Sequence, residues 1–140
     1  MLRYMLKMAG ARAKVEKFEV GVSGKTNAIW SNGVDQNRKL ACIFGDSMIR
    51  ALMQRNHVQK WPFINVIISC TPGATCAHLE KEIQSFIYPK RPDVIILQVG
   101  TNNIKKRDWQ RALAESRDQF RRLVKRSKDV CDVSTFTIYL

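Results

Sequence analysis

Three mostly apolar runs, each followed by a turn of small or amide residues, limit what this chain can fold into more than any other feature. The runs cover residues 40–44, 64–69 and 94–99 and are rich in β-branched side chains. Between them, apolar residues recur at helical spacing, and all four prolines fall in the connections. Apolar strands that alternate with helices are typical of a parallel sheet covered on both faces.

We therefore predict the α/β class, and within it a three-layer α/β/α, doubly wound parallel sheet of the flavodoxin-like type. Helices are expected near residues 47–56, 75–87 and 108–128, and a fourth strand over residues 134–140. Right-handed crossovers place the strand over 40–44 between those over 64–68 and 94–99. Because the chain stops at the fourth strand, the sheet is expected to be incomplete at its C-terminal edge.

Length and composition predict the domain organisation. A chain of 140 residues is long enough for one hydrophobic core. Residues 1–37 carry apolar side chains scattered among glycine, serine and asparagine, which predicts a basic, poorly structured leader. The folded domain is then expected over residues 38–140.

The sequence shows neither a membrane span nor a secretory signal. No apolar stretch approaches the roughly 20 residues that cross a bilayer, and the first residues lack a continuous apolar segment. The cysteines Cys42, Cys70, Cys76 and Cys131 form no C-x-x-C pair, which favours reduced thiols in or near the core. We predict an intracellular protein, cytoplasmic or nuclear, that uses no cofactor and no metal.

The formal net charge is +12, and much of it comes from one segment. Residues 105–128 carry ten bases and three acids. The excess predicts a polyanionic partner, either nucleic acid or an anionic membrane surface. The alternative is a solvated helix face on which acids and bases pair. The residues expected to contact nucleic acid are Lys105, Lys106, Arg107, Arg121, Arg122, Lys125 and Arg126.

The turns after the three strands carry the candidate site residues. Ser47 follows Gly45 and Asp46 at a tight strand-to-helix turn, which suits a serine nucleophile whose own N–H can stabilise developing negative charge. The alternative is that Ser47 only caps the helix. Gly73 and Asn102 follow the next two strands, and each has an alternative as a turn former. Sites in doubly wound sheets lie outside the carboxyl ends of the strands, so all three residues are expected at one edge.

These turns resemble the signature of the SGNH hydrolases, also called GDSL-like esterases and lipases. Ser47 in the tripeptide GDS matches the first block of that signature, Gly73 in PGAT the second and Asn102 in GTNN the third. The resemblance implies a carboxylic-ester hydrolase acting on a small acyl ester, with Ser47 as nucleophile and Gly73 and Asn102 as donors to the oxyanion. The spelling is also similar to esterase-type domains carried by the first open reading frame of some vertebrate retrotransposons.

The fourth block of the signature, Asp-x-x-His, is missing. His57 and His78 are the two histidines, and neither has an aspartate three residues before it. Because that block supplies the general base in the family, the resemblance implies a domain truncated at its C-terminus and inactive or incomplete as an esterase. The alternative function is a non-catalytic basic module that binds nucleic acid or anionic surfaces.

Overall fold

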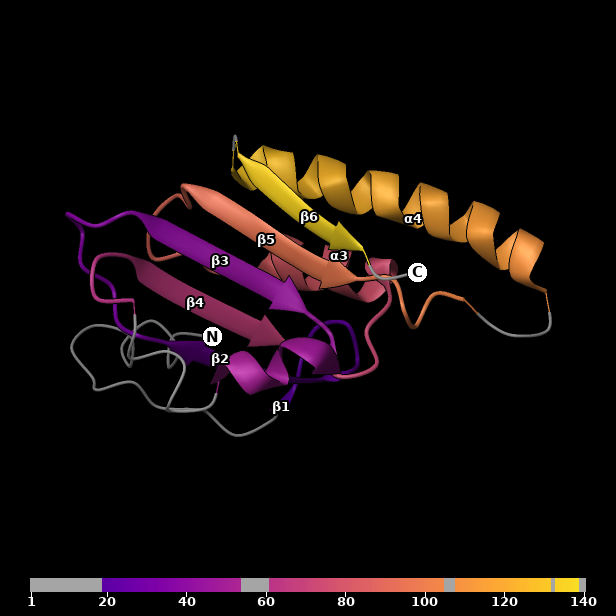
Figure 1. Ribbon diagram of the computed structural model, residues 1–140, viewed down its shortest axis with the longest axis horizontal. Coiled ribbons are helices and arrows are strands. Elements are labelled where there is room, and N and C mark those ends of the chain that lie inside the picture. Colours follow the sequence, from indigo (N-terminus) through magenta and orange to yellow (C-terminus); the bar gives the residue numbers. More distant parts are fainter. Residues whose placement is uncertain (1–18, 54–60, 105–107, 132, 139–140) are drawn as a thin grey trace.

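A six-stranded mixed sheet forms the centre of the structure (Figure 1). The computed structural model describes residues 19–53, 61–104, 108–131 and 133–138. Across the sheet the strand order is β1-β2-β4-β3-β5-β6, with β4, β3, β5 and β6 parallel and β2 antiparallel to both of its neighbours. In chain order the strands are β1 (Glu19–Val20), β2 (Thr26–Ser31), β3 (Leu40–Gly45), β4 (Asn65–Cys70), β5 (Val94–Val99) and β6 (Ser134–Ile138).

Helices cover both faces of this sheet. On one face, Leu79 and Ile83 of the second helix and Leu123 of the third are fully buried. On the other face, Ile49 and Met53 of the first helix pack against β3 and β4. A fully buried aliphatic side chain contributes about 1.5–3 kcal/mol, so both faces stabilise the fold. The helices are η1 (Ser47–Met53), which is a 3₁₀ helix, α3 (Cys76–Ser85) and α4 (Trp109–Val130).

The predicted α/β class is confirmed, and so is the order of the parallel strands. β3 lies between β4 and β5, and β6 lies beyond β5. The first predicted helix is a 3₁₀ helix, because the Ile49 N–H bonds to the backbone oxygen of Asp46, three residues back, at 3.3 Å. Its expected continuation over residues 54–56 lies outside the described residues.

Part of the segment predicted as a leader belongs to the sheet. β2 pairs with β4, and its Ala28 and Trp30 are 1% and 4% exposed. These two side chains alternate with more exposed neighbours, as in a strand with one face on the core. The leader prediction therefore does not hold for the residues of β1 and β2. Two alternating buried positions among glycines and asparagines are too short a pattern to recognise, and residues 1–18 lie outside the described residues.

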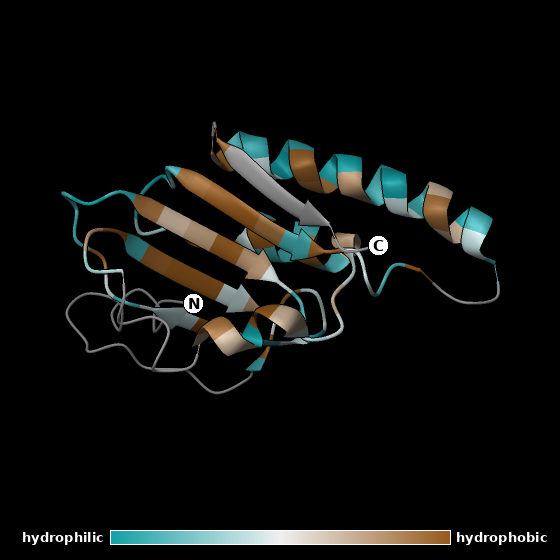
Figure 2. Cartoon of the chain, in the orientation of Figure 1, coloured by the Kyte–Doolittle hydropathy of each residue, from teal (hydrophilic) through white to brown (hydrophobic). Residues whose placement is uncertain are grey.

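Among the helices that the structure describes, none is both long enough and apolar enough to span a bilayer. α4 is the longest of them, and hydrophilic and hydrophobic residues alternate along it (Figure 2). Its apolar side packs on the sheet and α3, so its hydrophilic side faces outward.

Candidate functional site at the carboxyl ends of the parallel strands

The three predicted site residues follow three neighbouring parallel strands. Ser47 begins η1 after β3, Gly73 lies in the turn after β4, and Asn102 lies in the loop after β5, and all three are exposed. One nitrogen holds their surroundings together, because Nδ2 of Asn102 donates to Oδ2 of Asp46 at 3.2 Å and to the backbone oxygen of Ala74 at 3.1 Å. Asp46, which precedes Ser47, and Ala74, which follows Gly73, are thus both bonded to the side-chain amide of Asn102.

The turn from β3 into η1 is shaped by Gly45 and Asp46. A Cβ atom at Gly45 would lie 2.9 Å from the backbone oxygen of Gln98, so only glycine fits between β3 and β5. Asp46 is 1% exposed, and its Oδ1 accepts the Met48 N–H at 2.9 Å, which caps the start of η1. The capping role that was the alternative for Ser47 therefore belongs to Asp46. Within the described residues, the Ser47 hydroxyl has no hydrogen-bond partner.

Gly73 occupies a turn that glycine adopts readily and other residues do not. Its φ angle is +69°, and the Ala74 N–H bonds to the backbone oxygen of Thr71 at 3.0 Å, which closes a type II turn. Neither the Gly73 N–H nor the Ser47 N–H donates to an acceptor in the described part of the chain. Both are therefore backbone donors that a ligand could use.

Asn102 ties loops together rather than offering a donor. A side-chain amide has two hydrogens, and Asn102 gives one to Asp46 and one to Ala74. Thr101 adds a weaker contact, with its Oγ1 at 3.5 Å from Oδ2 of Asp46. The resemblance implied that the amide of Asn102 would bind an oxyanion, but here both hydrogens are committed to the protein. Asn102 thus fixes the geometry of the strand ends.

The neighbouring Asn103 has a role that the sequence did not reveal. Its Oδ1 accepts the Cys76 N–H at 3.0 Å, which caps the first turn of α3 from a loop 27 residues away. Its Nδ2 donates to Oε1 of Gln119 on α4 at 2.8 Å. No local pattern predicts a cap that is supplied from another part of the chain.

His78 is engaged in the cap of α3 rather than with Ser47. Its Nδ1 accepts the Thr75 N–H at 3.1 Å and lies 2.7 Å from the Thr75 hydroxyl. Burial lowers the pKa of His78, and the positive charges of Lys25 and Lys81 lower it further. The ring is therefore neutral at pH 7, with its acceptor nitrogen already occupied. His57, the other histidine, lies outside the described residues.

Two buried side-chain oxygens lack a hydrogen-bond partner among the described residues, and both lie at this end of the sheet. Thr71 directly follows β4 and is fully buried, with its Oγ1 unpaired. Gln98 of β5 is 6% exposed, and its Nε2 contacts the sulfur of Met48 while its Oε1 is unpaired. Such atoms are rare in folded proteins, and each of them calls for an explanation.

No metal-binding cluster is present among the residues that the structure describes, because nowhere do three His, Cys, Asp or Glu side chains gather. The four cysteines are all buried and unbridged. Burial raises the pKa of the Cys70 thiol and of the Cys76 thiol to about 11, so both are protonated at neutral pH. They are therefore core residues, as the sequence predicts.

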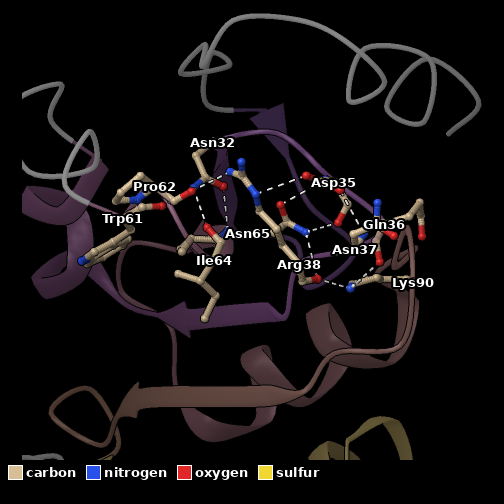
Figure 3. Close-up of polar contacts among 11 residues, drawn as sticks. Asn32, Asp35, Gln36, Asn37, Arg38, Trp61, Pro62, Ile64, Asn65 and Lys90 are labelled. Carbon is tan, nitrogen blue, oxygen red and sulfur yellow. Dashed lines mark hydrogen bonds and ion pairs between the residues drawn. The ribbon is translucent and has the colours of Figure 1, made fainter.

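The amino-terminal ends of the parallel strands are closed by a polar network (Figure 3). Asn65 is 3% exposed, and its Nδ2 donates to the backbone oxygens of Asp35 at 2.6 Å and Arg38 at 3.3 Å. Its Oδ1 accepts the Asp35 N–H at 3.0 Å. The Lys90 ammonium also donates to the backbone oxygen of Arg38. The side-chain amide of Asn65 therefore makes all of its hydrogen bonds within the protein.

Asn32 supports the start of β4 in the same way (Figure 3). Its Oδ1 accepts the Val66 N–H at 2.7 Å, and its Nδ2 donates to the backbone oxygen of Ile64 at 2.9 Å. Buried side chains with no unmet hydrogen-bonding capacity stabilise a fold but have nothing to offer a ligand. The network at the amino ends is therefore structural.

The outer face of α4 is basic, and part of its charge is neutralised. Arg122 and Arg126 contact Glu80 of α3 at 3.5 and 3.7 Å, and Arg121 contacts Asp118 at 3.5 Å. This pairing fits the alternative of a solvated helix face. Within the described part of α4, the bases without an ion pair are Arg117, Lys125 and Lys128. Lys105, Lys106 and Arg107 lie outside the described residues.

No family model and no curated protein matches this chain. Among solved structures, it is similar to a Zn-dependent exopeptidase from Parabacteroides distasonis, with 17% identity and a TM-score of 0.45, over 98% of this chain and 73% of that one. It is also similar to the M20 family metallo-carboxypeptidase Sso-CP2 from Sulfolobus solfataricus, with 15% identity and a TM-score of 0.31, over 68% of this chain and 26% of that one. The match thus spans about a quarter of the second structure.

The assignment to the SGNH hydrolases is wrong on these findings. No family model supports an SGNH domain of either the general or the retrotransposon-associated type, and neither of the two solved structures described above is an SGNH hydrolase. The GDSL-type esterase function and its acyl-ester substrate fall with it, and no comparison supports the alternative of a non-catalytic basic module. The physical reason is that the three matching blocks are turn sequences, in which Asp46 caps η1, Gly73 forms a type II turn and Asn102 ties two loops.

The two similar structures do not make this chain a metallopeptidase. At these identities and TM-scores, neither similarity extends to mechanism. The donor residues that a zinc site requires are also not gathered in the described part of the chain. The function is therefore argued from the geometry of the strand ends themselves.

Proposed function

We propose that the carboxyl ends of β3, β4 and β5 form a binding site for an oxyanion group, a carboxylate or a phosphate, of a small ligand. The donors would be the N–H groups of Ser47 and Gly73 and the Ser47 hydroxyl. Backbone N–H groups held by rigid strand ends are well suited to receive an electron-rich oxygen. We call this group of donors the strand-end site.

The observation that carries the proposal is the concentration of unmet hydrogen-bonding capacity at one end of the sheet. The N–H donors of Ser47 and Gly73 have no acceptor in the described part of the chain, and the buried hydroxyl of Thr71 has no partner there either. The opposite end, around Asn65, satisfies its buried amide completely. Among the described residues, the carboxyl ends are therefore the better place for binding.

The same geometry favours binding over catalysis. His78 is neutral, and its acceptor nitrogen is occupied by Thr75, so it is not available to take a proton from Ser47. Asn102 uses both amide hydrogens within the protein. No base is bonded to Ser47 in the described part of the chain, and a serine without a base is a weak nucleophile at neutral pH, so the Ser47 hydroxyl acts here as a hydrogen-bonding group.

The proposal includes the finer fold class, a doubly wound sheet of the flavodoxin-like type. Its support is the order β4-β3-β5-β6, in which the direction of strand addition reverses between β3 and β5. In doubly wound sheets, ligands bind outside the carboxyl ends of the strands at such a switch point. Ser47 and Gly73 lie at the ends of the two strands on one side of that point, β3 and β4.

A titration followed by ¹⁵N amide spectra tests the strand-end site. Inorganic phosphate and acetate are the probes, and the Gly73 and Ser47 amides are expected to shift with one common dissociation constant for each probe. Gly33 is the control, because it also has a positive φ, of +106°, but its N–H already donates to the Ser31 hydroxyl at 3.1 Å. Ser47→Ala should weaken the binding of both probes, because it removes one hydrogen-bond donor. Equal shifts at Gly33 and Gly73, or none at Gly73, would reject the proposal.

A second partner, nucleic acid on the outer face of α4, is supported by a specific spacing. Arg117, Arg121, Lys125 and Lys128 are exposed and recur every three or four residues, so they form one row along the helix. Three of the four have no ion pair in the described part of α4. A row of cations about 6 Å apart suits the phosphates of a nucleic acid backbone.

Salt dependence and a matched pair of variants test this partner. Binding of a short single-stranded RNA should weaken steeply between about 50 and 200 mM salt, because phosphate contacts release counterions. Arg117→Gln should reduce the affinity and flatten that salt dependence. Arg111→Gln is the control, since Arg111 lies on the same helix but is paired with Glu115 at 2.9 Å. Equal effects of the two variants, or no retention of RNA at low salt, would remove nucleic acid as a partner.

A further inference from the structure

The turn between β1 and β2 has a fixed shape that positions Lys25. The Gly21 N–H donates to the backbone oxygen of Lys25 at 2.7 Å, and the Gly24 N–H donates to that of Gly21 at 3.0 Å. The Lys25 N–H in turn lies 3.3 Å from the Ser23 hydroxyl oxygen, which accepts from it. Gly24 has a φ of +79°, which a glycine adopts without cost. The backbone of Lys25 is therefore held by the turn.

This turn is anchored on α3 through Glu82. Glu82 is 7% exposed, and its Oε1 accepts from both the N–H and the hydroxyl of Ser23, at 3.0 and 2.5 Å. Its Oε2 accepts from Nδ2 of Asn27 at 3.3 Å. A Cβ at Gly21 would lie 2.4 Å from Oε1, so the backbone of the turn closes directly over the carboxylate. Charge-assisted hydrogen bonds of this kind are stronger than neutral ones.

The anchored turn brings the Lys25 ammonium to the strand-end site. Its Nζ lies 3.9 Å from the position that a Cβ of Gly73 would occupy. Gly73 carries one of the two unpaired backbone N–H donors of the site. No ion pair of the Lys25 ammonium is present within the described residues, so its charge is not neutralised there. Lys25 also lies close enough to His78 to affect that ring electrostatically.

We propose that Lys25 is the charge-selecting residue of the strand-end site, so that the site prefers a ligand group with a full negative charge over a neutral group of the same shape. The inference rests on the proposed function, since it assumes that an oxygen of the ligand reaches the Gly73 N–H. The ammonium then adds a Coulombic attraction that a neutral amide or ester oxygen does not receive. Glu82 acts through the turn and is a positioning residue.

The test compares acetate with acetamide, which has nearly the same shape but no charge. Dissociation constants are measured from the shift of the Gly73 amide in the unmodified protein, in Lys25→Gln and in Lys81→Gln. Lys81 is the matched control, because it is an exposed lysine that also lies near His78 but belongs to α3. Lys25→Gln should raise the dissociation constant of acetate by about fivefold at low salt. This is the factor expected for the loss of one unit charge about 4 Å away in water. Acetamide binding should stay the same, and Lys81→Gln should change acetate binding by less than about twofold.

A readout without ligand completes the test. Lys25→Gln should raise the pKa of His78, measured from its ring proton shifts, because it removes one of the charges that lower it. Unchanged acetate affinity in Lys25→Gln, with the Gly73 amide still shifting, would overturn the role of Lys25 and leave the strand-end site standing. A Gly73 amide that responds to neither probe would overturn the site and the role of Lys25 together.

Discussion

The two ends of the parallel strands contain similar residues but use them in opposite ways. At the amino ends, the amides of Asn65 and Asn32 bond to backbone groups through both their oxygen and their nitrogen (Figure 3). At the carboxyl ends, Thr71 Oγ1 and Gln98 Oε1 have no partner among the described residues. The comparison teaches that polar residues beside a sheet do not by themselves mark a site. What marks it is hydrogen-bonding capacity that the protein leaves unmet.

This difference predicts that the amino ends stabilise the fold whereas the carboxyl ends bind. Removing a fully used buried amide takes hydrogen bonds away from its backbone partners, and this lowers the free energy of unfolding. Removing an unpaired group costs little, since nothing in the protein depends on it. The variants below separate the two ends on this basis.

The largest effect is expected for Asn65→Ala. The change leaves the Asp35 N–H without its partner and removes one of the donors to each of the backbone oxygens of Asp35 and Arg38, and should lower the free energy of unfolding by about 3 kcal/mol. Urea denaturation measures it. Asn37→Ala is the control, because Asn37 is exposed and only its backbone N–H makes a bond, so its effect should stay within about 0.5 kcal/mol. Equal midpoints for the two variants would contradict the structural role of Asn65.

Asp46→Asn should have the next largest effect, because Asp46 is the part of the carboxyl end that the protein does use. Its Oδ2 accepts from Nδ2 of Asn102, and an amide nitrogen at that position would face another donor. We expect a loss of about 2 kcal/mol in urea denaturation. Asp118→Asn on the exposed face of α4 is the control and should change stability by less than about 0.5 kcal/mol. A loss for Asp46→Asn no larger than that of the control would show that the strand ends are not tied through Asp46.

A smaller, pH-dependent effect is expected at His78. Because the folded-state pKa of His78 is lowered, the unfolded chain binds the proton more readily. The contribution of His78 to the free energy of unfolding is fully present above about pH 6.5, the ordinary pKa of histidine. It is lost as the pH falls through the lower folded-state pKa. His78→Gln keeps an acceptor for the Thr75 N–H and should lose less stability than the unmodified protein between neutral and mildly acidic pH. Parallel losses in the two proteins would contradict the lowered pKa.

Ser47→Ala should have the smallest effect on stability, within about 0.5 kcal/mol, because the hydroxyl is exposed and unpaired in the described part of the chain. Ser127→Ala is a matched comparison, since Ser127 is fully buried and its hydroxyl bonds to the backbone oxygen of Val124 at 2.8 Å. It should cost about 1 kcal/mol.

The same Ser47 variant also tests the correction of function. The unmodified protein should hydrolyse a short-chain acyl ester no faster than Ser47→Ala does, because His78 is held by Thr75. Turnover in the unmodified protein that disappears in Ser47→Ala would contradict a binding-only site.

The sequence predicted the parallel part of the fold because its signals are local and strong. Residues 40–44, 64–69 and 94–99 are mostly apolar, and this identified the three central strands and their order. β2 was missed because only Ala28 and Trp30 carry its alternation. A two-residue pattern does not stand out against the glycines and asparagines around it.

The sequence predicted that the three candidate residues follow the ends of parallel strands, but not what their polar atoms bond to. Strand ends can be placed from the sequence, which brought Ser47, Gly73 and Asn102 to one edge. Whether a polar atom is already used cannot be seen there, because the partners of Asn102 come from two other loops. The same limit hid the anchoring of Lys25 by Glu82, which depends on a contact between residues 59 positions apart. The family assignment failed for this reason, because short turn sequences do not by themselves establish a catalytic site.

Amide hydrogen exchange tests the central claim most directly, because it reports which N–H groups the protein leaves unpaired. Without ligand, the Ser47 and Gly73 amides should exchange nearly as fast as in an unstructured peptide, whereas the Val66 amide, bonded to Asn32 at 2.7 Å, should be strongly protected. Addition of inorganic phosphate should slow exchange at Ser47 and Gly73 and leave Val66 unchanged. Protection of Ser47 and Gly73 equal to that of Val66 before any ligand is added, or exchange at both that phosphate does not slow, would contradict the account.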